Sequence, residues 1–229
     1  MILAATGLKR EARSLGGPSV HVVAGGGDRR RLERELGDAA RGAAGVISIG
    51  LGGALAADLR PGDWVVASGV RTLDASEPTP TDPAWTASLL RRLPGARSGL
   101  IFGSDIIVAD QASKARAHAL TGAAVVDMES HVAAAIAARH GLPFVAARVV
   151  SDAADRSLPR AALAGMAADG GMDLLAVIRA LVRDPSQLPA LIRTGGEAET
   201  AFRALSRGRD LLGPGLGRLN LGELPLDVA

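Results

Sequence analysis

Short apolar runs alternate along this chain with longer segments in which apolar residues recur every three or four positions. We expect strands at 1–6, 19–24, 46–50, 64–70, 98–102, 124–126 and 144–150. Helical spacing follows at 28–41, 114–120 and 129–139, with a loop rich in Pro, Thr, Ser and Asp at 74–83. Strands that alternate with helices are typical of an α/β domain with helices packed on a sheet.

The stretch from Ala124 to Asp155 has the clearest organisation. An apolar run, a helix-like segment, a Gly-Leu-Pro stop and a second apolar run follow one another there. A strand–helix–strand unit of this length predicts two parallel strands joined by a right-handed crossover. Asp127 and Glu129 would then lie at the same sheet edge as Asp152 and Asp155, where open α/β sheets bind ligands.

These acidic residues also have a simpler interpretation. Glu129 could only begin a helix, and Asp152 could only cap the next one. Two acidic sets at matching strand ends favour a substrate crevice about as strongly as these local roles, and both interpretations stay open from the pattern alone.

The chain has 229 residues, 48% of them hydrophobic, which is enough to bury a full core. We expect one domain over residues 1–212, whose part 158–212 is helical, and an irregular tail at 213–229. The expected C-terminal helices cover 158–175, 176–183 and 187–212.

Composition excludes several classes of protein. The net charge is only +2, and three Phe, two Trp and no Tyr leave few rings for stacking on nucleic-acid bases. No apolar run approaches the ~18–20 residues of a membrane span, and the first residues lack the features of a secretory signal. Without cysteine there is no thiolate metal site, and the four His residues show no ligand spacing. We therefore expect a cytoplasmic protein without a metal or cofactor.

Glycines cluster at 25–27 and 50–53, directly after two predicted strands. Glycines there allow the backbone to approach an anion or a sugar closely. A dinucleotide fingerprint needs a further Gly, but Arg30 and Leu55 occupy the required positions. An NAD-dependent or nucleotide-binding oxidoreductase is thus a weak alternative.

The sequence VDME at 126–129, with SD at 151–152 after a strand that carries Arg148, resembles the superfamily of nucleoside phosphorylases and methylthioadenosine/adenosylhomocysteine nucleosidases. The resemblance implies a three-layer αβα sandwich around a central mixed sheet, here with extra C-terminal helices. It also implies an enzyme that cleaves the N-glycosidic bond of a purine nucleoside.

The resemblance assigns roles to individual residues. Glu129 would hold the ribose hydroxyls in its ionised form, and Met128 would pack against the sugar. Asp152, kept protonated by burial, would protonate or hydrogen-bond N7 of the leaving purine. Asp127 and Ser151 complete the expected substrate contacts on these two segments.

The glycine-rich turns would hold the second substrate. In the resembled family the first turn contributes phosphate contacts in phosphorylases, or a Glu that activates water in hydrolases, and Glu11 is the candidate for this Glu. A helix-start Glu exposed to solvent is an equally strong interpretation of Glu11. The glycines expected to approach phosphate or water are Gly7, Gly50, Gly52 and Gly53. Leu51 replaces the family's usual Ser, so both phosphorolysis and hydrolysis stay open, with inorganic phosphate as a potential second substrate.

The base would lie against the segment after the strand at 98–102. Ile107 stands where the family usually has an aromatic residue that stacks on the purine, and an aliphatic wall stacks more weakly. Val108 would read the purine edge through its backbone.

Several motifs are most similar to the hopanoid-associated branch of the superfamily: LRPGD at 59–63, SDAADRSLP at 151–159 and PSQLPAL at 185–191. The branch implies removal of adenine from adenosylhopane in hopanoid biosynthesis. A nucleosidase for small methylthioadenosine-type substrates is the alternative, and a non-catalytic nucleoside-binding protein is an alternative of another class.

The leading interpretation of the helices after residue 158 is core packing. The alternatives are subunit contacts, a lid, or an amphipathic surface peripheral to the inner membrane face. We expect a homo-oligomer, with a dimer as the first expectation.

Overall fold

The computed structural model describes residues 1–165 and 170–218. The strands are β1 Ile2–Thr6, β2 Val20–Ala24, β3 Gly45–Ala54, β4 Trp64–Arg71, β5 Thr79–Pro80, β6 Arg97–Gly103, β7 Val125–Asp127 and β8 Phe144–Asp152. The helices are α1 Lys9–Leu15, α2 Arg29–Ala39, α3 Pro83–Arg92, α4 Gln111–Thr121, α5 Ser130–Arg139, α6 Arg160–Ala164, α7 Leu174–Arg183 and α8 Leu188–Leu212, with a 3-10 turn η1 at Pro185–Gln187. All seven strands expected from the apolar runs are present.

Aspartates start four of the helices. The carboxylate of each accepts a hydrogen bond from the backbone N–H three residues later, which satisfies one of the free amides of a helix start. These residues are Asp28 before α2, Asp82 before α3, Asp110 before α4 and Asp173 before α7. Only the cap at Asp28 was expected from the sequence, and α3 was not expected at all, because the loop before it obscured its start.

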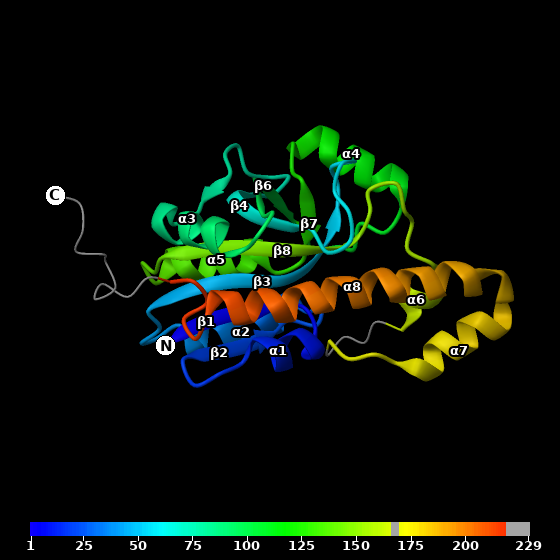
Figure 1. Cartoon of the computed structure of the whole chain (residues 1–229), viewed down its shortest axis with the longest axis horizontal. Helices are drawn as coiled ribbons and strands as arrows, with labels where there is room; N and C mark the ends of the chain where they lie inside the picture. The colour runs from blue at the N-terminus through cyan, green and yellow to red at the C-terminus, as the bar shows by residue number, and fades with distance from the viewer. Residues whose placement is uncertain (166–169, 219–229) are drawn as a thin grey trace.

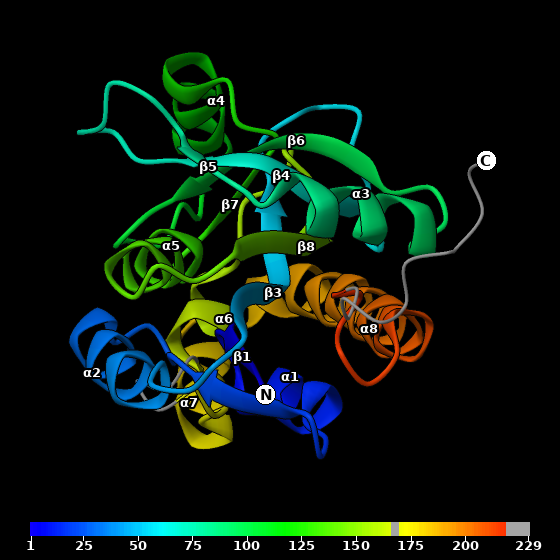
Figure 2. The same ribbon diagram turned by 90° about the vertical axis from the view of Figure 1, so that its left-hand side faces the viewer.

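The strands form one mixed sheet in which β3 is the central member. Its first half pairs in parallel with β1, and β1 pairs in parallel with the edge strand β2. Its second half lies between β8, which is parallel to it, and β7, which is antiparallel. Because β8 also pairs with β4, β4 with β6, and β6 with β7, these five strands close into a ring. Figure 2 shows β3 running from β1 and β2 toward this ring.

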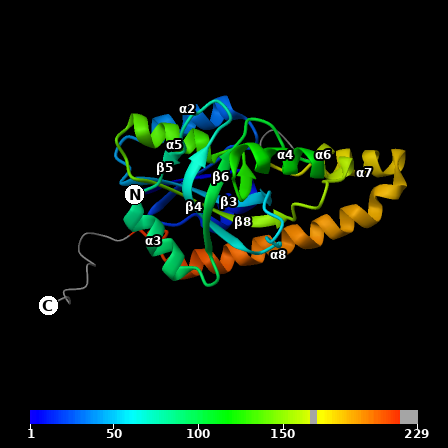
Figure 3. The same ribbon diagram turned by 90° about the horizontal axis from the view of Figure 1, so that it is seen from above.

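Helices cover both faces of the sheet, as Figure 3 shows from above. On one face, α2 and α5 bury Leu32, Leu36, Val132 and Ile136 against the strands. On the other, α1, α3 and α8 bury a second cluster that includes Leu15, Trp85, Leu89, Leu205 and Leu212. A third, smaller cluster lies between α4 and the ends of β6 and β7. The expectation of an α/β fold with a central mixed sheet is confirmed.

The prediction that the strands before and after α5, which are β7 and β8, pair in parallel is wrong. Both β7 and β8 pair with β3, on opposite sides and in opposite directions, so the two strands are not parallel neighbours. They nevertheless meet at one place, because Val126 and Asp152 are both partners of Gly53. The two carboxyl ends therefore converge on the end of β3 rather than on a shared parallel edge.

Two boundaries also differ from expectation. The glycine cluster at 50–53 is part of β3 and not a loop after it, since it pairs with β8 along its length and at Gly53 also with β7. The single helix expected at 158–175 is absent as such: α6 spans five residues, and Gly170 has a φ of +78°. Residues 166–169 of that prediction and 219–229 of the expected tail lie outside the described residues.

The helices α6 and α7, with the start of α8, project from the body of the molecule, at the right of Figure 1. Their exposed apolar side chains include Leu174, Leu175, Ile178, Val182 and Ile192. Within residues 1–165 and 170–218, no helix combines the length and the apolar character needed to cross a bilayer.

We predict opposite effects of Gly→Ala changes at two positions of α8. At Gly208, a Cβ would lie 2.4 Å from Trp64 Cζ2 and 3.2 Å from Leu93 Cδ2, whereas at Gly195 it would meet nothing within 4 Å. Gly208→Ala should lower the free energy of unfolding by about 1–3 kcal/mol through overpacking. Gly195→Ala should raise it by about 0.5–1 kcal/mol, because Ala favours the helix.

Urea denaturation measures both variants, and Gly195→Ala is the matched control for the helix-propensity gain. Equal stabilisation by the two changes would contradict the close packing of α8 on Trp64.

Candidate functional site

Three predicted catalytic acids come together around the second half of β3. Glu11 lies in α1, Glu129 follows β7, and Asp152 ends β8, and their exposed fractions are only 1%, 7% and 6%. Buried carboxyl groups need hydrogen-bond donors or opposite charges, because otherwise their desolvation is costly. The partners of each acid therefore indicate its state.

Glu11 is held by three donors. Its Oε2 accepts hydrogen bonds from Thr6 Oγ1 at 2.5 Å and from the Leu8 N–H at 2.6 Å, and its Oε1 accepts one from the Leu51 N–H at 2.7 Å. The solvent-exposed interpretation of Glu11 is thus wrong, since α1 presents it to the interior. Leu51, where a Ser was expected, contributes its backbone instead of a side chain.

Two glycines make room for the carboxylates. A Cβ at Gly50 would lie 2.9 Å from Glu11 Oε1, and a Cβ at Gly7 would lie 3.0 Å from Glu129 Oε1 and 3.5 Å from Glu11 Oε2. Glu11 and Glu129 therefore approach each other across Gly7. Of the four glycines expected to approach phosphate or water, Gly7 and Gly50 approach these two carboxylates. Gly53 approaches the carboxylate of Asp152, and Gly52 approaches the Val126 carbonyl oxygen and the Arg148 side chain.

Glu129 has the most perturbed acidity in the site. Burial raises its pKa from 4.5 to about 8, the charges of Asp127 and Glu11 add to the rise, and the Arg148 guanidinium opposes it. The nearest oxygen of Glu129 lies 3.5 Å from Arg148 Nη2, so this pairing is loose. The raised pKa favours protonation of Glu129 in this structure, and the expectation that Glu129 is ionised when it binds the sugar stays a prediction.

Asp127 is engaged with protein partners in this structure. Arg148 Nη2 lies 2.5 Å from its Oδ2, and the N–H and hydroxyl of Ser130 both donate to it. Arg148 Nη2 also donates to Ser48 Oγ at 2.6 Å. Asp127 therefore positions Arg148 in this structure, and its substrate contact stays a prediction.

Asp152 is paired with a cation that the sequence pattern does not indicate. Lys114, fully buried on α4, donates a hydrogen bond to Oδ2 of Asp152. Ser151 Oγ lies 2.6 Å from Oδ1. Asp152 is buried as expected, and both of its oxygens face donors. Ser151 thus acts on Asp152 in this structure.

The remaining residues with predicted roles follow β6, β7 and β8. Ile107 is 42% exposed on the segment after β6, Val108 packs against the cluster beneath α4, and Met128 is half-buried beside Gly27. The side chain of Asp155 is 65% exposed, so this residue does not join the buried group.

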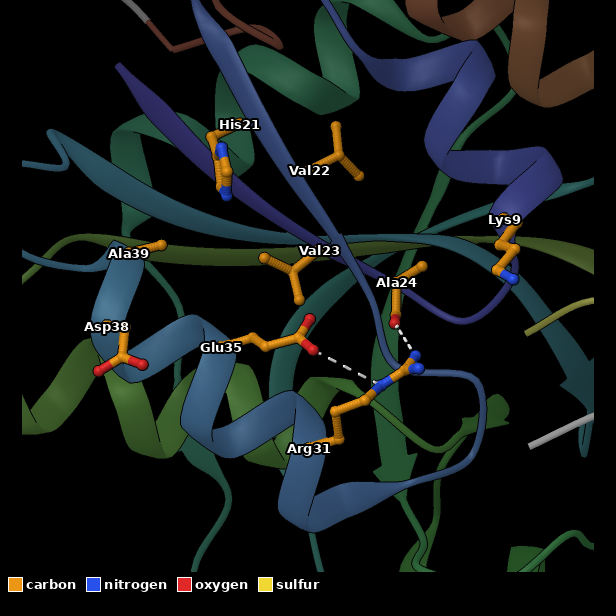
Figure 4. A pocket seen from close by; sticks show the side chains of 9 residues that line it. All are labelled: Lys9, His21, Val22, Val23, Ala24, Arg31, Glu35, Asp38 and Ala39. Atoms are coloured by element: carbon orange, nitrogen blue, oxygen red, sulfur yellow. Dashed lines mark hydrogen bonds and ion pairs between the residues drawn. The ribbon is translucent and has the colours of Figure 1, made fainter. Parts of the chain in front are cut away.

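A separate cavity of about 650 Å³ lies at the outer edge of the sheet, between β2 and α2. Figure 4 shows Arg31 beside it, donating to the Ala24 carbonyl oxygen, with His21 and Glu35 on its walls. None of the three buried acids lines this cavity.

Four residues that support the acids were not assigned roles from the sequence: Thr6, Ser48, Lys114 and Arg148. Arg148 was noticed as part of the strand before Ser151, and a charged residue in an otherwise apolar run is the available signal. Lys114 is one of only two lysines, but its place in a polar helix gave no sign of burial.

Comparison with protein families matches residues 30–183 to the family described as the phosphorylase superfamily. Comparison with curated proteins gives no match. Among solved structures, the chain is similar to a 5′-methylthioadenosine/S-adenosylhomocysteine nucleosidase from Colwellia psychrerythraea in complex with adenine. The TM-score is 0.68 at 19% identity, over 96% of this chain and 97% of that one.

Two structures from Helicobacter pylori are also similar, each covering 91% of this chain and 97% of the other at 15% identity. One is a 5′-methylthioadenosine/S-adenosylhomocysteine nucleosidase, with a TM-score of 0.63, and the other is a futalosine hydrolase, with a TM-score of 0.61. At these identities the likeness concerns the fold. Because the family match spans about two thirds of the sequence and includes Glu129 and Asp152, this chain belongs to the phosphorylase superfamily.

Proposed function

We propose that this protein is a nucleosidase that hydrolyses the N-glycosidic bond of a purine nucleoside. The convergence of buried Glu11, Glu129 and Asp152 on the glycine-rich end of β3 carries the proposal. The similar structures include nucleosidases and a hydrolase, which supports the same reaction class. Water as the second substrate makes a metal or cofactor unnecessary in this proposal.

The contacts of Glu11 favour hydrolysis over phosphorolysis. The backbone N–H groups of Leu8 and Leu51, which could otherwise bind an anion, donate to its carboxylate. A phosphate ion here would compete with Glu11 for these donors and would be repelled by its charge. A carboxylate accepts about four hydrogen bonds, so three donors leave about one position for a water molecule.

In the proposed reaction, this water attacks the anomeric carbon and Glu11 accepts its proton. The C–N bond breaks as positive charge develops on the sugar and negative charge on the base. Glu129 binds the ribose hydroxyls, and its ionised form stabilises the cationic sugar. Asp152 hydrogen-bonds or protonates N7 of the leaving base, a contribution typically worth ~10²–10⁴-fold in rate.

We further propose adenosylhopane as the substrate, with peripheral membrane contact through the projecting helices. The backbone of Lys9, next to the Gly7 turn, donates to the Gly170 carbonyl at 3.0 Å, which places the approach to α7 beside the site. Along α7, Leu174, Ile178 and Val182 are 55–76% exposed, a surface suited to a long apolar 5′-substituent. Methylthioadenosine-type nucleosides are the alternative substrates, favoured by the similar structures.

Adenine release tests the substrate and the reaction together. We expect release from adenosylhopane in phospholipid vesicles, at a rate independent of phosphate, and co-sedimentation of the protein with the vesicles. Release only from adenosine or methylthioadenosine would reject the hopanoid substrate and keep the enzyme. A requirement for phosphate would reject hydrolysis, and no release from any substrate would favour a non-catalytic binding protein.

We predict that Asp152→Asn lowers kcat by ~10²–10⁴-fold, because the variant loses the acid that faces the base. Asp155→Asn is the matched control: the same change three residues along, on a side chain that is 65% exposed, should leave kcat unchanged. Equal activity of Asp152→Asn and wild type, measured as adenine release, would refute the assigned role.

The raised pKa of Glu129 predicts a pH-dependent stability. Between its ordinary value of 4.5 and its value of about 8 in the folded protein, the native state binds more protons than the unfolded state. The stabilising contribution is therefore complete below about 4.5 and is lost as pH rises through about 8.

Glu129→Gln removes this group. As pH rises across this window, the free energy of unfolding of the wild type should fall relative to that of the variant by up to about 1.4 kcal/mol per pH unit. Urea denaturation at a series of pH values measures the difference. Glu33→Gln, which alters an exposed ion pair with Arg139, should instead run parallel to the wild type. A constant offset for Glu129→Gln would show that Glu129 titrates normally.

A further inference from the structure

Lys114 is a buried cation whose position the fold fixes completely. It lies on α4, its side chain has no solvent exposure, and its ammonium group makes three hydrogen bonds. An ammonium group is costly to bury unless its charge and all its protons have partners. Lysine has three N–H donors, so every donor of Lys114 is used.

All three acceptors belong to the end of β8 and the turn after it. They are Asp152 Oδ2, the Ala153 carbonyl oxygen at 2.9 Å and the Arg156 carbonyl oxygen at 2.9 Å. With Ser151 Oγ at 2.6 Å from Oδ1, the Asp152 carboxyl group is held at both oxygens. Rotation of Asp152 would break the contact with Lys114.

The start of α4 is tied to the same turn by the backbone. The Leu158 N–H donates to the Ala109 carbonyl at 2.8 Å, and the Gln111 N–H donates to Ser157 Oγ at 3.1 Å. The segment expected to contact one face of the base, which ends at Ala109, is thus joined to the segment that carries Asp152. Lys114 adds a third link between the two segments, because it lies on α4 and donates directly to the Asp152 carboxyl group.

We propose that Lys114 is a positioning residue, which holds the Asp152 carboxyl group in the orientation needed to meet the leaving base. The proposal rests on the proposed nucleosidase function. Lys114 reaches the base only through Asp152, because its own ammonium group is enclosed by protein. Its positive charge also stabilises the carboxylate that remains on Asp152 once the proton has passed to the base.

A double-mutant cycle on Lys114→Met and Asp152→Asn tests the proposal. The substrate is whichever of adenosine, methylthioadenosine and adenosylhopane the wild type cleaves fastest. Lys114→Met should lower kcat by about 10²-fold, as expected for a misplaced catalytic group, with KM changed less than about threefold. The double variant should be no slower than Asp152→Asn, because Lys114 acts only through the acid.

Arg116→Met, which removes an exposed cation from the same helix, is the matched control and should retain wild-type kcat. Lys114→Met leaves Asp152 without its partner and could fail to fold, but the double variant removes both charges. If Lys114→Met does not fold, the kcat of the double variant compared with that of Asp152→Asn still tests the proposal.

Two results would overturn the proposal while leaving the nucleosidase function intact: a kcat for Lys114→Met equal to that of the wild type, or a double variant much slower than Asp152→Asn. A wild-type protein that releases no base would overturn the nucleosidase function, and the role of Lys114 with it.

Discussion

The site depends on the compensation of four carboxyl groups buried around the end of β3. Among the residues that the structure describes, the buried acids are Glu11, Asp127, Glu129 and Asp152, and the buried cations are Lys114 and Arg148. Arg148 pairs closely with Asp127, Lys114 pairs with Asp152, and two backbone amides with a hydroxyl hold Glu11. Glu129 is left with a loose partner, and protonation is the remaining way to bury it. The pKa of Glu129 is therefore raised because the nearby cations and hydrogen-bond donors are engaged mainly with the other three carboxyl groups.

The backbone imposes the second constraint, because the carboxyl groups can converge only where side chains are missing. The end of β3 has glycines at 50, 52 and 53, and the carboxylates of Glu11 and Asp152 occupy space beside the first and the last of them. The same glycines remain in the strand: all three pair with β8, and Gly53 also pairs with Val126 of β7. The strand therefore has no side chains at these positions but keeps its pairing with β8. The carboxyl groups thus lie beside a strand rather than on a loop.

Much of the fold could be predicted from the sequence, because β-branched runs and capped helices are local signals. The place of Glu129 and Asp152 could be predicted as well, but from a wrong topology: parallel neighbours were expected, and two oppositely directed partners of Gly53 were found. Strand direction depends on distant pairings, which a local pattern does not contain. The partners of the acids were missed for a related reason. Lys114 precedes Asp152 by 38 residues, and no spacing rule links a helix residue to a strand end at that separation.

The two buried cations distinguish the two ends of the proposed reaction. Arg148 lies in β8, pairs with Asp127 at the end of β7 and faces Glu129, on the proposed side of the sugar, where positive charge would develop. Because Asp127 and Ser48 hold Arg148, which lies 3.5 Å from Glu129, Glu129 is left to change protonation and to meet the hydroxyls. Lys114 stands behind Asp152, on the side of the base, where negative charge would develop, and its contact is close and fully satisfied. A cation held fixed behind the acid strengthens binding to the departing base, while a weakly neutralised carboxyl group opposite strengthens binding to the sugar. The uneven division of positive charge across the site thus has the direction that heterolytic cleavage of a glycosidic bond requires.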